Sequence, residues 1–67
     1  MNIEIIGNNA GLVWNALSTK NGQTVKELKK ATKIKTDKVL FAALGWLARE
    51  NKVAIEESED DLVITLL

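Results

Sequence analysis

Ten consecutive residues, Val39–Ala48, contain neither a charged nor an amide side chain. The run is too short to cross a bilayer, which takes about 20 apolar residues, and Lys38 and Arg49 flank it. At about 100° per residue it predicts a helix whose apolar arc is wide enough for a domain core. That arc contains Val39, Leu40, Ala43, Leu44 and Leu47. The other side of the helix is also apolar, and in a lone domain it would face water: Phe41, Ala42, Gly45 and Ala48.

The composition argues against catalysis. The 67 residues are expected to form one domain, 1–67, without disulfides or thiolate metal sites, because the chain has no cysteine. Histidine is absent as well, and no base is predicted beside Ser18, Ser58 or any threonine. We therefore expect no enzyme, no catalytic residue, no metal, no cofactor and no small-molecule substrate. Met1–Ile6 lacks the features of a signal peptide, so a cytoplasmic protein that does not enter the membrane is expected.

Apolar residues at helical spacing predict a first helix that runs to about Thr19. One face of it would contain Ile3, Ile6, Ala10, Val13, Trp14 and Leu17, with Trp14 in the core. The alternative is a shorter helix that begins near Ala10, capped by Asn8 or Asn9, after a short strand at Ile3–Ile6. The longer helix is favoured.

Two further helices are predicted after a turn at Asn21-Gly22. Thr24 and Glu27 have the spacing of a capping box, so a second helix should begin there and run to about Thr32. It would bury Val25, Leu28 and Ala31. After a connector at residues 33–35, the third helix should begin at Thr36 or Asp37 and end near Asn51.

The last part of the chain has the alternation of a β-hairpin. Residues 52–57 and 62–67 alternate with period two, with Ser58–Asp61 as the connecting loop. Aligning their apolar residues pairs Val53 with Leu66, Ile55 with Ile64 and Glu57 with Leu62.

The local sequence resembles that of a winged helix-turn-helix domain. Residues 24–28 (T-V-K-E-L), followed by Ala31, Thr32 and Ile34, resemble the opening of many such motifs. Residues 10–17 (A-G-L-V-W-N-A-L) and 43–50 (A-L-G-W-L-A-R-E) resemble a family of short, stand-alone prokaryotic winged helix-turn-helix proteins of uncharacterised function. The resemblance implies an α+β fold of three helices followed by a two-stranded wing, with DNA binding presumed by analogy.

The charges do not favour specific DNA recognition. In such domains the early outward residues of the third helix read base edges, yet among them only Lys38 can donate to a base or phosphate. Arg49 lies on the same side but two turns further on, too far from the tip to enter the groove. The hairpin is acidic where a phosphate-contacting wing would be basic, because it carries Glu56, Glu57, Glu59, Asp60 and Asp61. Cations gather instead around the turn, where they could bind nucleic acid without sequence preference: Lys26, Lys29, Lys30, Lys33, Lys35 and Lys38.

The outward side of the third helix is instead predicted to contact protein, because contiguous exposed apolar residues usually mark an interaction site. We call this surface the outer face: Phe41, Ala42, Gly45 and Ala48, with Trp46 at its edge. For Trp46 a core position is favoured, and a place in the interface is the alternative. The sequence thus predicts an interaction module that pairs with a second copy or another protein, with DNA binding through the lysines as the alternative.

Overall fold

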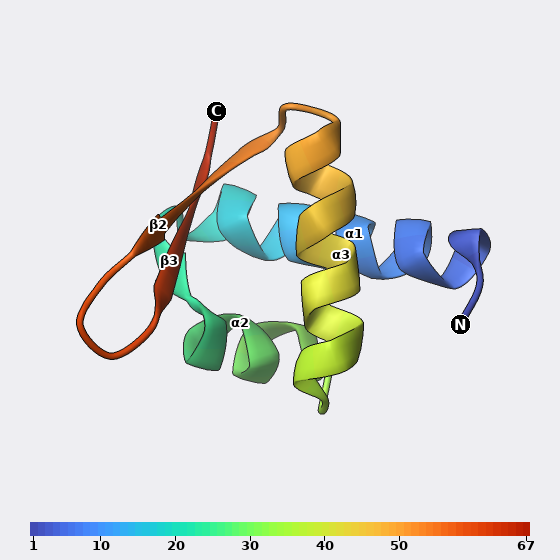
Figure 1. Ribbon diagram of the computed structural model, residues 1–67, viewed down its shortest axis with the longest axis horizontal. Coiled ribbons are helices and arrows are strands. Elements are labelled where there is room, and N and C mark those ends of the chain that lie inside the picture. The colour runs from blue at the N-terminus through green and yellow to red at the C-terminus, as the bar shows by residue number, and fades with distance from the viewer.

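Three helices and a three-stranded antiparallel sheet make up the computed structural model, which describes residues 1–67. In chain order the elements are α1 (Ile3–Thr19), β1 (Gln23–Thr24), α2 (Val25–Thr32), α3 (Asp37–Arg49), β2 (Val53–Glu57) and β3 (Leu62–Leu66). Figure 1 shows α3 crossing α1, with the hairpin of β2 and β3 on the left. This arrangement confirms the predicted winged helix fold. No helix combines the length and the apolar character needed to span a bilayer.

The long form of the first helix is confirmed. The side chain of Asn2 caps α1 by accepting a hydrogen bond from the backbone N–H of Ile5, at 2.9 Å. With its first turn capped there, the helix needs no cap at Asn8 or Asn9, and the alternative strand at Ile3–Ile6 is wrong.

The predicted caps of α2 and α3 are also confirmed. Thr24 Oγ1 accepts from the N–H of Glu27 at 3.1 Å, and Glu27 Oε1 accepts from the N–H of Thr24 at 2.9 Å. Thr36 caps α3 by accepting from the N–H of Val39. Asn51 lies just beyond α3 in the left-handed conformation, with a φ of 59°. The sequence of the turn and of both caps therefore sets where α2 and α3 begin.

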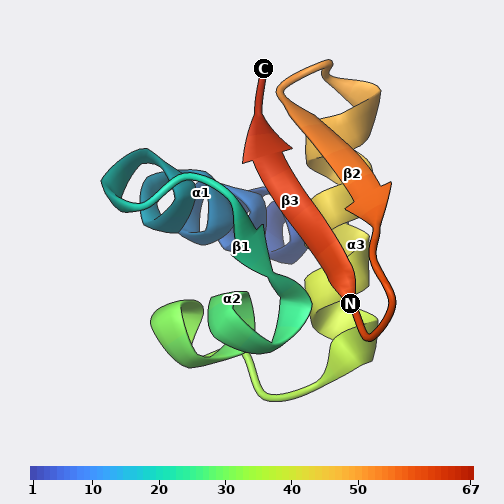
Figure 2. The same cartoon turned by 90° about the vertical axis from the view of Figure 1, so that its left-hand side faces the viewer.

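The hairpin has the predicted register, in which Val53 pairs with Leu66 and Ile55 with Ile64. A third strand was missed, because β1 pairs with β3 through only two residues. The sheet order is therefore β1-β3-β2, and Figure 2 shows it face on. Gln23 of β1 is buried, and its Nε2 donates to the carbonyl oxygens of Ala16 and Lys20 at the end of α1. A buried polar residue thus joins the sheet to the first helix.

The core lies between the three helices and the sheet. Its buried members are Ala10, Val13, Leu17, Val25, Leu28, Ile34, Leu40, Ala43, Leu44, Leu47, Val53 and Ile64. The predicted arc of α3 is confirmed, with Val39 only partly buried.

Several residues predicted to be in the core are not. Trp14 is 41% exposed and Trp46 is 37% exposed, so the favoured core positions of both tryptophans are wrong. Ile3 is 70% exposed because α1 extends past α3 at its N-terminal end (Figure 1). Ala31 is exposed on α2. A helical wheel gives the direction of a side chain, but it does not give the length over which a neighbouring helix covers it.

Candidate interaction surface

The outer face of α3 lies at the surface, as the sequence predicts. Phe41 is 44% exposed, Gly45 and Ala48 are exposed, and Ala42 is half-buried. Lys38 and Arg49 are exposed near the two ends of the same helix. A Cβ atom added at Gly45 would meet nothing within 4 Å, so the surface of α3 is open at Gly45. The result is an apolar strip with a cation toward each end.

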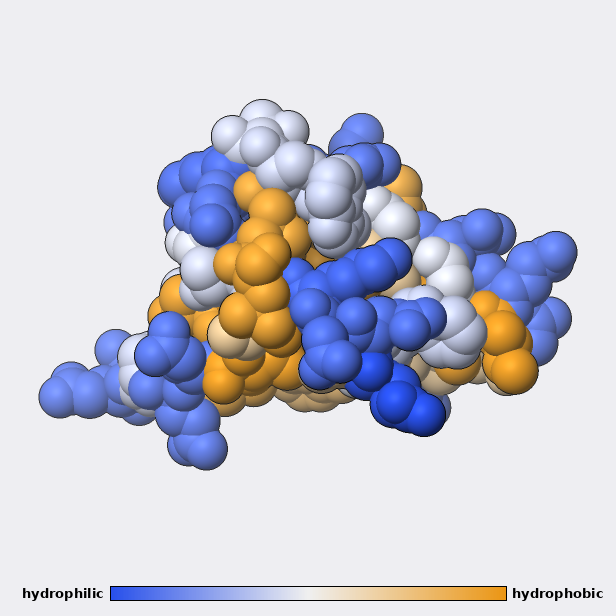
Figure 3. All heavy atoms as spheres, turned by 90° about the horizontal axis from the view of Figure 1, so that it is seen from above, coloured by the Kyte–Doolittle hydropathy of each residue, from blue (hydrophilic) through white to orange (hydrophobic).

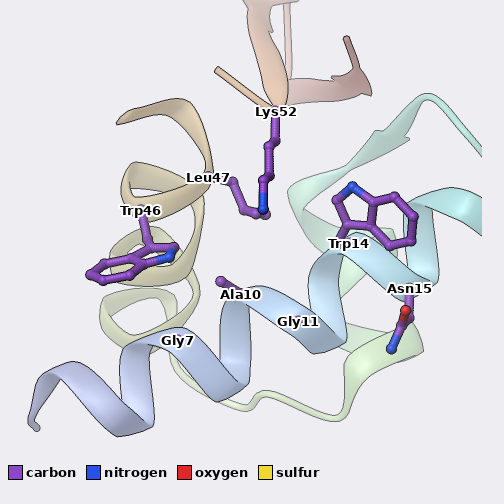
Figure 4. Close-up of a pocket in the computed structure, with 8 residues that line it drawn as sticks. All are labelled: Gly7, Ala10, Gly11, Trp14, Asn15, Trp46, Leu47 and Lys52. Atoms are coloured by element: carbon purple, nitrogen blue, oxygen red, sulfur yellow. The ribbon is translucent and has the colours of Figure 1, made fainter. Parts of the chain in front are cut away.

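A groove between α1 and α3 adjoins this face through Trp46 (Figure 4). It has a volume of about 280 Å³. The two tryptophans stand at its ends, and the side chain of Lys52 hangs between them. The lining residues are Gly7, Ala10, Gly11, Trp14, Asn15, Trp46, Leu47 and Lys52. Because Gly7 and Gly11 carry no side chain, the α1 side of the groove is open down to the helix backbone.

Sequence reasoning missed this groove. It placed Trp14 in the core with its apolar neighbours, and it treated Gly7 and Gly11 only as weak points in a helix. The available signal was their spacing, because glycines four residues apart lie on one face of a helix, next to Trp14 on the following turn.

The lysines around the turn are brought together in part. Lys29, Lys30, Lys33 and Lys35 surround a hollow beside Ile34. Lys29 is already paired, because its Nζ lies 2.8 Å from Asp37 Oδ1. The structure thus places four of the six predicted lysines around one hollow, although one of these four is neutralised by a neighbouring carboxylate.

The acidic loop between β2 and β3 contacts the N-terminal end of α2. Asp61 Oδ2 accepts a hydrogen bond from the backbone N–H of Lys26, at 3.1 Å, in the first turn of α2. Asp60 and Asp61 line a cleft together with Lys26, Lys29 and Lys30. Helix N-termini favour anions, so this carboxylate occupies a position that a phosphate could otherwise take. Figure 3 shows the loop as a hydrophilic projection at one end of the molecule.

The hydroxyl groups considered as nucleophiles are engaged with the backbone. Ser18 Oγ donates to the carbonyl oxygen of Trp14 at 2.9 Å, and Ser58 Oγ donates to that of Asp61 at 2.6 Å. The structure gathers no group of three acidic, cysteine or histidine side chains that could hold a metal ion. Hydrogen bonding within the capping box, chiefly from the Thr24 backbone, lowers the pKa of Glu27, and Lys20 at 3.3 Å lowers it further. That shift has a structural cause in the helix cap.

Comparison with known proteins gives a family and a solved relative. The model of the family described as "Winged helix-turn-helix domain (DUF2582)" matches residues 1–66. The solution NMR structure of protein BT2368 from Bacteroides thetaiotaomicron is similar, with a TM-score of 0.85 and 39% sequence identity. The likeness covers 98% of this chain and 79% of that one. No curated protein matches the chain.

Proposed function

We propose that this chain, which belongs to the winged helix-turn-helix family DUF2582, acts as a non-enzymatic interaction module that pairs with a second copy of itself. The pairing surface is the outer face of α3, with Trp46 at its edge. The proposed place of action is the cytoplasm. Another protein with a complementary apolar surface is the alternative occupant of that face.

One observation carries the proposal. The side of α3 that faces water is apolar along its middle, where a helix that reads DNA needs donors and acceptors for base edges. Phe41 is large, exposed and adjacent to the open surface of Gly45, so a second helix can approach closely there. Exposed apolar residues grouped in this way are typical of interaction sites, and a domain of this size gains stability when it pairs.

Phe41→Glu tests the proposal when its mass is measured by light scattering after size-exclusion chromatography. A charge in the middle of a buried apolar contact should dissociate the pair into single chains. Ile55→Glu is the matched control, because Ile55 is 41% exposed on β2 and lies outside the outer face, the groove and α1. Dissociation by both variants alike, or by neither, would contradict the role given to Phe41.

Binding of duplex DNA through the lysines is the second candidate. It is favoured by the four lysines that surround the hollow at Ile34. Neutralising phosphates releases counterions, so such binding should weaken steeply with salt and ignore sequence. Fluorescence anisotropy with two duplexes at low and moderate salt distinguishes the two functions. Tight, sequence-dependent binding at moderate salt would overturn the proposal, whereas binding lost with salt and with reversal of Lys33, Lys35 and Lys38 supports only nonspecific contact.

A further inference from the structure

The outer face of α3 is small for a complete interface. Its only large side chain is Phe41, since the other members of the strip are glycine and alanine. A stable interface of ordinary size buries about 800 Å² on each partner. That is roughly one sixth of the 4572 Å² that this molecule exposes. A second copy seated on α3 must therefore cover neighbouring surface as well, and the groove that shares Trp46 is the surface next to it.

The groove specifies the chemistry of its occupant. Two indole rings offer apolar walls, and Lys52 is the one charged residue among those that line it. Lys52 has no ion-pair partner within the molecule. An occupant that complements these groups has an apolar side chain beside a carboxylate, presented on an element slim enough to lie over Gly7 and Gly11.

The first turn of α1 has that composition. Ile3 is 70% exposed and Ile5 is 45% exposed, and Glu4 lies between them in the sequence. Glu4 is the only acidic residue before Glu27, and it too has no ion-pair partner. This part of α1 projects beyond α3 (Figure 1), so none of its large apolar side chains reaches the core. Isolated helical turns are marginal in water and are stabilised by packing.

We infer that the α1 helices of two copies lie antiparallel, and that the first turn of each copy occupies the groove of the other. This inference rests on the proposed self-association and assigns the partner's contribution to it. Residues spaced three and four apart share a face of α1, and here they are Glu4, Gly7, Asn8, Gly11 and Asn15. Two such faces that meet between Gly7 and Gly11 bring Glu4 of one copy opposite Trp14 of the other. Lys52 hangs into the same groove, between Trp46 and Trp14 (Figure 4).

The arrangement has the two-fold symmetry of a closed dimer. Each copy gives one first turn and receives one, so both ion pairs of Glu4 with Lys52 form and no surface is left to add a third copy. Ile3, next to Glu4 in the sequence, then packs against the indole of Trp14. The outer face of α3 continues the same contact through Trp46.

Charge reversal tests the pairing. Glu4→Lys and Lys52→Glu should each raise the dimer dissociation constant by about tenfold, because two attractive pairs become repulsive. The double variant Glu4→Lys with Lys52→Glu should restore the wild-type constant. Glu56→Lys and Lys35→Glu are matched controls that make the same charge changes away from the groove. Sedimentation equilibrium measures the constant.

The lysine of Glu4→Lys stands at the start of α1, where a positive charge is unfavourable to the helix dipole and can destabilise the helix. Circular dichroism should therefore accompany each measurement, to show that the helix content is unchanged. Glu4→Gln, which removes the charge without reversing it, gives the second readout and should weaken the dimer less than Glu4→Lys does. Suppose that the wild type is a dimer and that Phe41→Glu dissociates it, but that Glu4→Lys and Lys52→Glu change the dissociation constant no more than their controls do. That result contradicts the antiparallel α1 arrangement and leaves the proposed function standing. Failure of the double variant to restore the dimer also contradicts it. A wild-type monomer overturns both.

Discussion

Asp61 and Lys26 are joined across 35 residues of sequence by one hydrogen bond, from the backbone N–H of Lys26 to Asp61 Oδ2, at 3.1 Å. The bond holds the acidic loop of the hairpin against the N-terminus of α2. In a winged helix that contacts DNA, both elements would face phosphate with positive charge. Here the carboxylate of Asp61, in the hairpin loop, occupies the N-terminus of α2 instead.

Removing these charges should therefore improve the affinity for nucleic acid. Asp60→Asn with Asp61→Asn leaves an oxygen able to accept from Lys26 but removes two negative charges from the cleft shared with Lys26, Lys29 and Lys30. We expect binding to duplex DNA at low salt to tighten by about threefold to tenfold, as anisotropy would measure. Glu56→Gln with Glu57→Gln changes the net charge equally on β2. An equal gain in this control would show that the position of Asp60 and Asp61 is irrelevant.

Glu27 makes part of the stability dependent on pH. Because its pKa is lowered in the folded protein, the ionised form is favoured by folding, and its contribution is present above the unfolded-state pKa. The contribution is lost as the pH falls through the lowered folded-state pKa. Urea unfolding should show Glu27→Gln less stable than wild type at pH 7, with the difference shrinking in acid. A difference that stays constant with pH would mean that the carboxylate charge plays no part in the cap.

Substitution of Gly45 should affect the stability of the single chain and the stability of the dimer in opposite directions. It lies inside α3, and an added Cβ meets nothing within 4 Å, so Gly45→Ala should stabilise a single chain by about 0.5–1 kcal/mol. The Phe41→Glu background isolates that effect, with denaturant unfolding as the measurement. In the wild-type background the added methyl group stands in the proposed contact, so the dimer should weaken. A dimer strengthened by Gly45→Ala would argue against close helix approach at this position.

The elements that could be predicted from the sequence are those whose determinants are local. Thr24 and Glu27 satisfy each other's hydrogen bonds within one turn, and the hairpin register follows from apolar alternation that matches only when Ile55 faces Ile64. The core arc of α3 likewise follows from helical spacing. These features need no knowledge of where other elements lie.

The features that escaped prediction depend on how elements meet. β1 has two residues, too few to show a period, and it exists because it pairs with Val63 and Ile64 of β3, more than 35 residues away in the sequence. Trp14 and Trp46 have core-like positions on their helices, but they flank the crossing of α1 and α3 and stay more than a third exposed. The candidate groove was missed for that reason, while the outer face was predicted because a single helix defines it.

The proposal that a second copy covers the outer face of α3 requires the wild-type protein to be a dimer in solution, and its mass decides this. Sedimentation equilibrium over a range of concentrations up to the high micromolar should give twice the mass of one chain, with dissociation on dilution. A mass equal to one chain at every concentration would contradict self-association.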